Sequence, residues 1–503
     1  MKRILFLCAL VAPRVADAFC GFYVATGDAP MYSDATQVVL MRNGTRTVLA
    51  MQNAYKGPPE AFAIVIPVPV VLHEADVKTL PAEVFPKVEA MSAPRLVEYW
   101  EQDPCVPAPM MGMACGTGTT TVTKLDPKTS DLGVKIEAKF AVGEYQIVIL
   151  SASDSTGLDT WLRKSGYTIP DAAAPLLRPY VEAGSKFFVA KVDPKKVRFE
   201  NGQAILSPLR FHYDDEHFAL PIRLGLASSA GTQDLIVNIF APHQRYEVAN
   251  YPNVTIPTNL DVRDSVRERF ASFYAALFDR TLELHPRAVV TEYAWQATTC
   301  DPCPGPTLDP RDLATLGADV LAGSREHPQP YDAYDLVLTR LHARYGKDVK
   351  DDLVFAQARP IVGGREYEAS GARADSYNNF QARYAIRHPW TGPITCEHPQ
   401  RGMWGGPPRE LGIAAAAPKP ALGLAFAPRG QIVLASAFAQ NVPEIDLRAG
   451  ASDPTTPHGA GVAPISTERK TRTGCGCVAG DGDVFGFGVV LVWLGYRRRR
   501  GTG

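Results

Sequence analysis

The sequence predicts an α+β fold, a strand-rich mixed body with inserted helices that is stabilised by disulfide bonds. Short apolar runs of strand length outnumber the amphipathic segments with helical periodicity. Hydrophobic residues make up 46% and charged residues 21% of the 503 residues, which is typical of globular proteins. Six cysteines lie in the body of the chain, an even number that allows complete pairing.

Most of the predicted strands lie in the first half of the chain. An Asn-Gly pair between the apolar runs 36–42 and 45–51 predicts a β-hairpin. Apolar and charged residues alternate at 134–140, which predicts a half-buried strand with a partner at 144–150. Further strands are predicted at 61–67, 187–192, 209–213, 235–240 and 431–438.

The predicted helices follow apolar residues spaced three and four positions apart. The strongest is 261–279, where one face is entirely apolar. Another helix follows the strand at 144–150 and ends before Gly166. Further helices are predicted at 81–100 with an interruption at Pro94, at 310–316 and at 331–345.

Changes in composition divide the chain into five parts. We expect a signal peptide at 1–18, a main exported body at 19–320, a second part of the body at 321–445, a flexible linker at 446–474 and a C-terminal sorting or transmembrane tail at 475–503.

The N-terminal segment has the order of a secretory signal peptide. Two basic residues precede a short apolar run at 4–12, and a small-x-small site ends at Ala18. The run is shorter than the roughly 20 residues that a helix needs to cross a bilayer. We therefore predict export, with cleavage between Ala18 and Phe19.

The C-terminal segment combines small residues, an apolar run and a basic cluster. The apolar run, 484–496, is about 20 Å long as a helix, against a hydrocarbon core of about 30 Å. Such a span suits a transient sorting signal better than a permanent anchor, although an amphipathic or disordered basic tail is an alternative. The flanking residues are Gly474, Cys475, Gly476 and Cys477 before it, and Arg497, Arg498, Arg499 and Arg500 after it.

This tail resembles the myxobacterial C-terminal sorting tail, in which a Gly-Cys motif precedes a hydrophobic helix and an arginine cluster. The resemblance implies a C-terminal sorting protease as a partner, processing near Cys475 and Cys477, and membrane association at the cell surface. The short apolar run and the two aspartates before it, Asp481 and Asp483, depart from that pattern.

Export would place the body in an oxidising compartment, where cysteines form disulfide bonds. Sequence alone leaves every pairing open. Short loops favour Cys105–Cys115 and Cys300–Cys303, which leaves Cys20–Cys396 to join the ends of the body. The six candidates are Cys20, Cys105, Cys115, Cys300, Cys303 and Cys396.

The Cys300-Asp301-Pro302-Cys303 motif has the spacing of redox-active cysteine pairs. Redox activity is favoured where a helix N-terminus stabilises one thiolate. Here Pro304 and Pro306 follow the motif and oppose a helix at that point. We therefore favour a structural disulfide, with a redox or metal role as the alternative.

No sequence pattern identifies a catalytic residue or a cofactor site. Common hydrolase, phosphate-binding and dinucleotide-binding motifs do not occur. His212 and His217 are weak metal candidates, and a polar turn between two strands explains their spacing better. His243, with Arg245 and Glu247, is interpreted as an ordinary polar group near a strand end. A net charge of −1 gives no reason to expect nucleic-acid binding.

Several stretches, taken in order, resemble the bacterial family catalogued as domain of unknown function 2330. The resemblance supports an exported body and implies no catalytic residues. The matching stretches span roughly residues 20 to 320 and include Cys20-Gly21-Phe22, 62–69, Ala93-Pro94-Arg95-Leu96, Asp103-Pro104-Cys105, Gly143-Glu144-Tyr145, Thr160-Trp161-Leu162, 206–210, and Glu292-Tyr293-Ala294-Trp295 with the Cys300–Cys303 motif.

These observations lead to three hypotheses for function. The first is a cell-surface protein that binds an unknown extracellular ligand or has a structural role in the envelope. The second is an exported thiol–disulfide redox protein that uses Cys300 and Cys303, and the third is a metal-dependent hydrolase that uses His212 and His217. The export machinery would be a partner in all three.

The processing sites give a direct test of the terminal predictions. Peptide mapping of the protein from its own cells should give a mature N-terminus at Phe19, because the small-x-small site ends at Ala18. It should also find a cut near Cys475 and Cys477. Recovery of an intact chain that still begins at Met1 would contradict the export prediction.

Overall fold

The computed structural model describes much of the chain between residues 22 and 450. The signal segment, Cys20, Cys115 and the tail at 475–503 lie outside the described residues. No helix in the described part is long and apolar enough to cross a membrane. The described ranges are 22–25, 32–33, 37–52, 55–56, 62–105, 135–165, 173–193, 195–200, 203–228, 232–321, 335–366, 368–408, 414, 416–424, 427 and 429–450.

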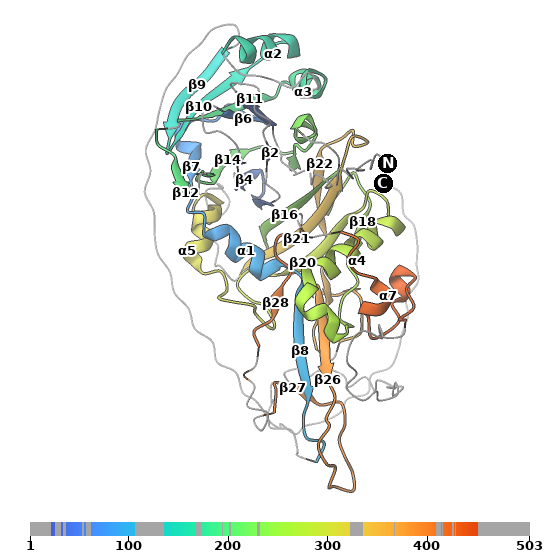
Figure 1. The fold of residues 1–503 in the computed structure, drawn as a ribbon. Helices are drawn as coiled ribbons and strands as arrows, with labels where there is room; N and C mark the ends of the chain where they lie inside the picture. Colours follow the sequence, from blue (N-terminus) through green and yellow to red (C-terminus); the bar gives the residue numbers. More distant parts are fainter. Residues whose placement is uncertain are drawn as a thin grey trace, which may run out of the picture. The chain divides into compact units, whose positions relative to one another are not determined.

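An eleven-stranded mixed sheet forms the centre of the described fold (Figure 1). It joins strands from both predicted parts of the body. Strand β21 (Leu336–Tyr345), from the second part, pairs along one edge with β20 (Val289–Gln296) and along the other with β16 (Gln233–Pro242), which both belong to the first part. Ten strands follow the order β24 (Arg373–Ala374), β23 (Ile361–Gly363), β25 (Asn379–Gln381), β20 (Val289–Gln296), β21 (Leu336–Tyr345), β16 (Gln233–Pro242), β3 (Gln37–Asn43), β4 (Arg46–Met51), β14 (Leu209–Asp214) and β7 (Val77–Thr79), and β18 (Asn253–Thr255) also pairs with β20.

A second sheet packs against one face of the central sheet. The alternation of residues in β6 shows the layers, because Ile64 and Ile66 face the core shared with the central sheet, whereas Ala63 and Val65 face the opposite side. Both sets are fully buried, which explains the continuous apolar run. The strand order is β1 (Phe22–Ala25), β6 (Phe62–Val68), β11 (Lys186–Val192), β10 (Tyr145–Ser151) and β9 (Lys135–Val142).

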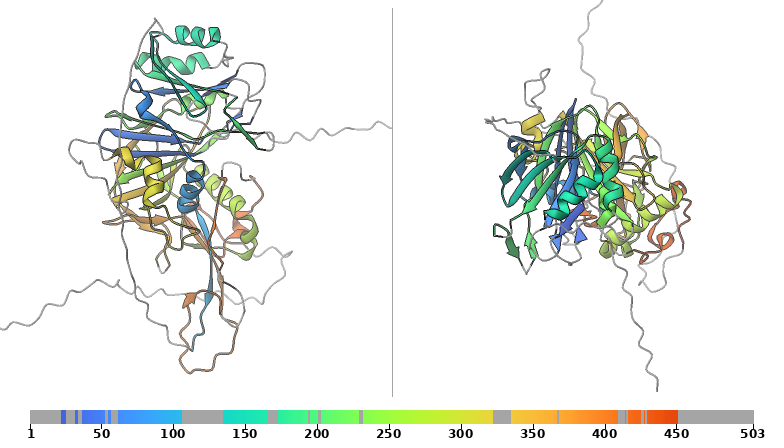
Figure 2. Two further views of the ribbon diagram at one scale, coloured as in Figure 1. Left: turned by 90° about the vertical axis from the view of Figure 1, so that its left-hand side faces the viewer. Right: turned by 90° about the horizontal axis from the view of Figure 1, so that it is seen from above.

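Helices cover the outer faces of these two sheets. Leu158 and Leu177, on α2 (Ser155–Lys164) and α3 (Ala173–Glu182), pack on the outer face of the second sheet, and Figure 2 shows these helices beside it. On the far face of β3 and β4, the packing helices are α1 (Val84–Ser92), α5 (Pro310–Leu313), η4 (Ala314–Ala318) and α6 (Asp319–Leu321).

A third sheet brings together residues from distant parts of the chain. Strand β8 (Arg95–Glu101) pairs in parallel with β26 (Arg383–His388), almost three hundred residues later. Against this sheet and one end of the central sheet packs α4 (Phe270–Leu284), preceded by η3 (Asp264–Arg269). The other members of the third sheet are β19 (Leu260–Asp261), β27 (Trp404–Gly405) and β28 (Lys419–Pro420).

The remaining elements are short and lie at the edges of these layers. They are β15 (Ala219–Leu220), β22 (Leu353–Ala358) and β17 (Arg245–Val248) in one sheet, the pairs β12 (Arg198–Glu200) with β13 (Gln203–Ile205) and β2 (Tyr32–Ser33) with β5 (Tyr55–Lys56), and the helices η1 (Glu74–Asp76), η2 (Arg223–Ser228), α7 (Leu434–Ala437) and η8 (Pro443–Ile445). Strand-rich sheets with fewer helices confirm the α+β prediction.

Three local predictions are wrong. The segment 331–345 contains strand β21, not a helix, because its polar side chains are buried in ionic contacts and do not mark a solvent-facing side. The segment 431–438 contains the short helix α7 instead of a strand. Helix α1 ends at Ser92, since Ala93 before Pro94 is extended, and a strand follows where 81–100 was expected to stay helical.

Two disulfide bonds lie within the described residues. Cys300 bonds to Cys303, as predicted. Cys105 bonds to Cys396 with a Cα–Cα distance of 5.5 Å, so the expected pairings Cys105–Cys115 and Cys20–Cys396 are wrong. The physical reason is the parallel pairing of β8 with β26, which brings the ends of both strands to the same edge.

These two crosslinks should differ strongly in their effect on stability. Chain entropy predicts that Cys105–Cys396, which spans 291 residues, contributes about 6 kcal/mol to the free energy of unfolding. For Cys300–Cys303, three residues apart, the same model gives about 2 kcal/mol. Urea unfolding of the two double Cys→Ser variants tests this order, and equal losses would contradict it.

Candidate functional site

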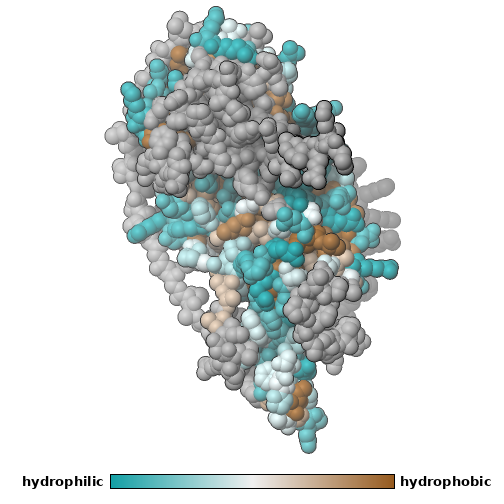
Figure 3. All heavy atoms as spheres, viewed as in Figure 1, coloured by the Kyte–Doolittle hydropathy of each residue, from teal (hydrophilic) through white to brown (hydrophobic). Residues whose placement is uncertain are grey.

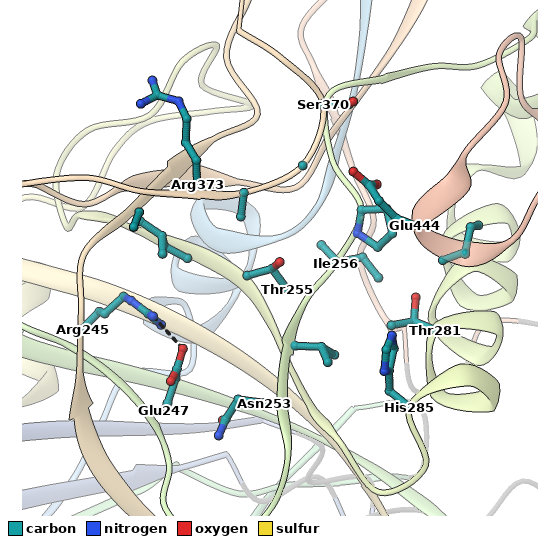
Figure 4. Close-up of a pocket in the computed structure, with 17 residues that line it drawn as sticks. Arg245, Glu247, Asn253, Thr255, Ile256, Thr281, His285, Ser370, Arg373 and Glu444 are labelled. Carbon is teal, nitrogen blue, oxygen red and sulfur yellow. Dashed lines mark hydrogen bonds and ion pairs between the residues drawn. The ribbon is translucent and has the colours of Figure 1, made fainter.

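A cavity of ≈ 540 Å³ lies where six segments of the chain meet (Figure 4). Because these segments are far apart in sequence, the fold alone creates the site. They are β17, the stretch 253–257 that includes β18, the C-terminal end of α4, the start of β23 at Ile361, the stretch 370–374 that includes β24, and η8.

One wall of the cavity holds a buried arginine. Arg245 donates from Nη2 to Glu247 Oε1 at 2.6 Å and from Nε to the carbonyl of Arg359. Its side chain is only 5% exposed, whereas that of Glu247 is 32% exposed. Residues two apart on a strand face the same side, which explains why this pair forms. The positive charge on this wall is therefore already neutralised.

Glu444 lies on a different side of the cavity and has no such partner. Among the described residues, no hydrogen bond or ion pair involves its carboxylate. Burial raises the pKa of Glu444. Gly371 lies directly against it, since a Cβ at that position would be 2.7 Å from Glu444 Oε1, and its φ of +79° also favours glycine. Figure 4 shows the carboxylate directed toward Ser370.

The end of α4 and an apolar floor complete the cavity. His285 is exposed, and its ring has no hydrogen-bond partner in the described part of the chain. Thr281 is buried, and its hydroxyl donates to the carbonyl of Leu277 at 2.9 Å. The apolar contribution comes from Val254, Ile256, Pro257, Ile361, Ala372, Ala374 and Ile445. This combination suits binding of a small molecule with both polar and apolar parts.

A buried ionic network lies in the central sheet near this cavity. Thr255 of β18 is paired in register with Thr291 of β20. The next residue, Glu292, occupies a β-bulge in β20 and is fully buried. Its carboxylate accepts hydrogen bonds from Arg340 Nε at 2.6 Å and from the Tyr274 hydroxyl at 2.8 Å.

His342 extends this network toward the opposite side of the sheet. Its Nδ1 lies 2.7 Å from Glu292 Oε1, and its Nε2 lies 3.8 Å from Asp234 Oδ2. The ring stacks on Phe278 of α4 with centroids 3.6 Å apart. Asp234 is in turn bound by Arg344, from Nε at 2.6 Å and from Nη2 at 2.8 Å.

The network holds its members in their charged forms. Burial alone would lower the pKa of His342, but the charges of Glu292 and Asp234 and the hydrogen bond to Glu292 raise it. Burial alone would raise the pKa of Glu292, but His342 and Arg340 lower it. The pKa of Asp234 lies well below its usual range, because Arg344 and His342 outweigh burial.

These groups are enclosed, which decides what they can do. The exposed fractions of Glu292 and His342 are 0% and 1%, so no substrate atom reaches them in this structure. The carboxylate–imidazole–carboxylate arrangement therefore organises the core and does not form an accessible catalytic centre.

The Cys300–Cys303 loop follows directly from the end of β20. Buried side chains bind the loop backbone at three carbonyls. The Tyr293 hydroxyl donates to the carbonyl of Thr299 at 2.7 Å, Gln381 Nε2 donates to that of Asp301, and Arg95 Nη1 donates to that of Pro302 at 2.9 Å. Each of the three donor residues has an exposed fraction of 0%.

Two arginines, Arg95 and Arg365, contact this loop. Burial lowers the pKa of Arg95 to about 10, although the nearby Tyr293 opposes the shift. On the surface, Arg365 Nη2 lies 3.3 Å from Asp301 Oδ2, and its guanidinium lies over the Trp295 ring at 5.6 Å. No helix follows the first cysteine directly, since the next helix, α5, starts at Pro310.

The two histidines singled out as weak metal candidates take separate partners. His212 lies within β14, and its Nε2 is 3.4 Å from Asp76 Oδ1. His217 lies in the turn before β15 and is 3.5 Å from Asp215, with its side chain 87% exposed. In the ranges that the structure describes, no group of three or more His, Cys, Asp or Glu residues could hold a metal ion.

The sequence pointed to some of these residues and not to others. It singled out Cys300 and Cys303, and it placed Arg245 and Glu247 near a strand end without assigning a site. It missed Glu444, which meets the cavity only through the fold. Glu292 could have been found, because a charged residue inside the apolar strand Val289–Gln296 needs a buried partner.

Comparison with known protein families shows which family this chain belongs to. Residues 14–356 match the family described as uncharacterised proteins conserved in bacteria, DUF2330. This chain belongs to that family. The match confirms the resemblance read from the sequence, whereas the sorting tail lies outside the matched residues. No curated protein and no solved structure matches this DUF2330 protein significantly.

The raised pKa of His342 predicts a specific pH dependence of stability. Above about pH 6.5 the unfolded histidine releases its proton while the native one keeps it, so the free energy of unfolding falls as pH rises through the folded-state pKa. His342→Gln should reduce this slope in urea unfolding above about pH 6.5. The matched control is His217→Gln, at an exposed position. Identical slopes in wild type and His342→Gln would contradict the prediction.

Proposed function

We propose that this DUF2330 protein is exported, retained at the cell surface and binds a small molecule carrying a positively charged amine. The observation that supports the ligand class is the uncompensated carboxylate of Glu444 on the wall of the ≈ 540 Å³ cavity. An ammonium group placed there would supply both the missing charge and hydrogen-bond donors.

The other charges of the cavity already have partners. Arg245 is bound to Glu247, and Arg373 Nη1 lies 2.8 Å from Asp375 Oδ2. The lining charges sum to zero with histidine neutral, but Arg245, Glu247 and Arg373 are paired, which leaves Glu444 as the lining carboxylate without a partner among the described residues. This balance favours a cation over an anion.

The size and the lining of the cavity agree with a small ligand. Its volume falls within the range of about 300–1,000 Å³ that is common for ligand pockets. The side chains of Ile256 and Ile361 would contact an apolar portion, and the hydroxyls of Thr255 and Ser370 can bind polar groups. A short amine with a few carbon atoms fits these features better than a long polymer.

The described surface gives less support to a large protein-binding face. Figure 3 shows one face of the molecule, and on the described part of this face hydrophilic residues surround small apolar patches. The large hydrophobic residues that are most exposed, Tyr377, Ile394, Leu422 and Val433, are distributed over separate segments.

Export and surface retention rest on other observations. The order of residues in 1–18 supports a secretory signal, and two disulfide bonds are typical of oxidising compartments. The tail at 475–503 supports membrane association and handling by a sorting protease. A metal-dependent hydrolase gains no support, since His212 and His217 take separate partners.

Calorimetric titration of the purified mature protein tests the ligand class. The probes are putrescine, lysine and glucosamine, with succinate and glucose as acidic and neutral comparisons. At least one amine should bind. The Glu444→Gln substitution should weaken the affinity for that amine about tenfold or more, because a hydrogen bond to a charged group contributes about 1.5–3 kcal/mol.

The matched control is Glu182→Gln, an exposed carboxylate at the end of α3 and outside the cavity lining. This variant should bind the amine as the wild type does. Binding of succinate alone, or amine binding that is unchanged in Glu444→Gln, would contradict the proposal.

A further inference from the structure

The Cys300–Cys303 disulfide is not needed to hold its own loop in place. Tyr293, Gln381 and Arg95 already bind the carbonyls of residues 299, 301 and 302 from the protein interior. A crosslink between residues three apart also restricts the unfolded chain little, compared with one that spans 291 residues. The stabilising crosslink of this fold is therefore Cys105–Cys396.

The disulfide is also accessible and lies next to positive charge. Cys300 and Cys303 are both partly exposed, and Asp301 between them is exposed. Arg95 binds the carbonyl of Pro302, which belongs to the peptide bond that leads into Cys303. Its Nε is buried and has no hydrogen-bond partner within the described residues.

A reactive cysteine pair needs such an environment. In many redox proteins a helix N-terminus stabilises one thiolate. Here no helix begins at the motif, but the buried guanidinium of Arg95, which binds the Pro302 carbonyl, provides a fixed positive charge next to the loop backbone. Pro304 and Pro306 exclude a helix after the motif, but the absence of a helix is therefore no longer an argument against a redox role.

We propose that Cys300–Cys303 is a thiol–disulfide exchange site that transfers two electrons to and from a cysteine pair of another exported protein. A partner thiolate attacks Cys300 Sγ, the Cys300–Cys303 bond breaks, and its electron pair leaves on Cys303 Sγ. The second partner thiolate then attacks the partner sulfur of this mixed disulfide. Cys300 leaves as a thiolate that takes up a proton, and the partner has become a disulfide.

The loop geometry suits repeated cycles of this kind. Since three buried donors hold the backbone, the two sulfur atoms stay close after reduction and the bond can form again without refolding. The fold is also kept intact by Cys105–Cys396 while the short pair opens.

The first test compares the two disulfides of the native full-length mature protein. The protein is equilibrated with increasing dithiothreitol at neutral pH, alkylated, and mapped by mass spectrometry. Cys300 and Cys303 should be labelled at dithiothreitol concentrations at least tenfold below those that label Cys105 and Cys396, with an unchanged circular dichroism spectrum. Labelling of both pairs together, only on unfolding, would overturn the proposal.

The second test measures exchange with a protein disulfide. The protein should accelerate the reduction of insulin by dithiothreitol several-fold, and Cys300→Ser with Cys303→Ser should abolish the acceleration. Glu182→Gln, at an exposed position outside the cavity and the cysteine loop, serves as the control and should retain it. A wild-type protein that gives no acceleration would overturn the proposal, even if its Cys300–Cys303 bond opens first.

The role of Arg95 is tested through the pH profile of alkylation of the reduced protein. The more reactive thiol should titrate below about 8.5, the value of a free cysteine. Arg95→Met should raise this midpoint, and Arg95→Lys should restore it in part. If Arg95→Met does not fold, the surface variant Arg365→Met is measured instead, and it should raise the midpoint to a smaller extent. A wild-type midpoint at or above that of free cysteine would overturn the proposal.

Discussion

The carboxylate of Glu292 lies in the protein interior with no exposed surface, and Arg340 on the neighbouring strand neutralises its charge at 2.6 Å. Two helices are fixed by this pair, since Tyr274 of α4 donates to Glu292 and Ser92 at the end of α1 lies 3.2 Å from Arg340 Nη1. Removing one partner of a buried pair leaves an uncompensated charge, which typically costs about 3–5 kcal/mol. The packing of the central sheet with both helices therefore depends on this contact.

Strand β20 connects that contact to both candidate sites. Glu292 lies in its middle, and the preceding Thr291 is paired with Thr255 of β18 at the cavity wall. Beyond the end of the strand, the chain turns into the Cys300–Cys303 loop. One well-buried strand thus sets the position of a pocket on one side and of a reactive loop at its end. This arrangement is the usual relation between a rigid scaffold and the loops that act on it.

The sequence predicted the local elements well where one pattern governed a whole segment. The hairpin around Asn43-Gly44 and the strand at 209–213 are confirmed, because alternation and turn chemistry act over a few residues. Strand β21 was mistaken for a helix, since Arg340 and His342 resemble a solvent-facing side although both are buried. The cavity could not be predicted, because Glu444 meets β17 and β18 only through long-range packing. The same limit explains the missed pairing of Cys105 with Cys396.

The Cys105–Cys396 bond also changes the covalent topology of the polypeptide. It closes a covalent ring from residue 105 to residue 396, and all of β20, α4 and the Cys300–Cys303 loop lie inside that ring. A protease that cuts once anywhere within it converts one chain into two pieces that remain a single molecule. A nick in one surface loop therefore releases neither half of the central sheet, which would protect a protein that is exported as we propose.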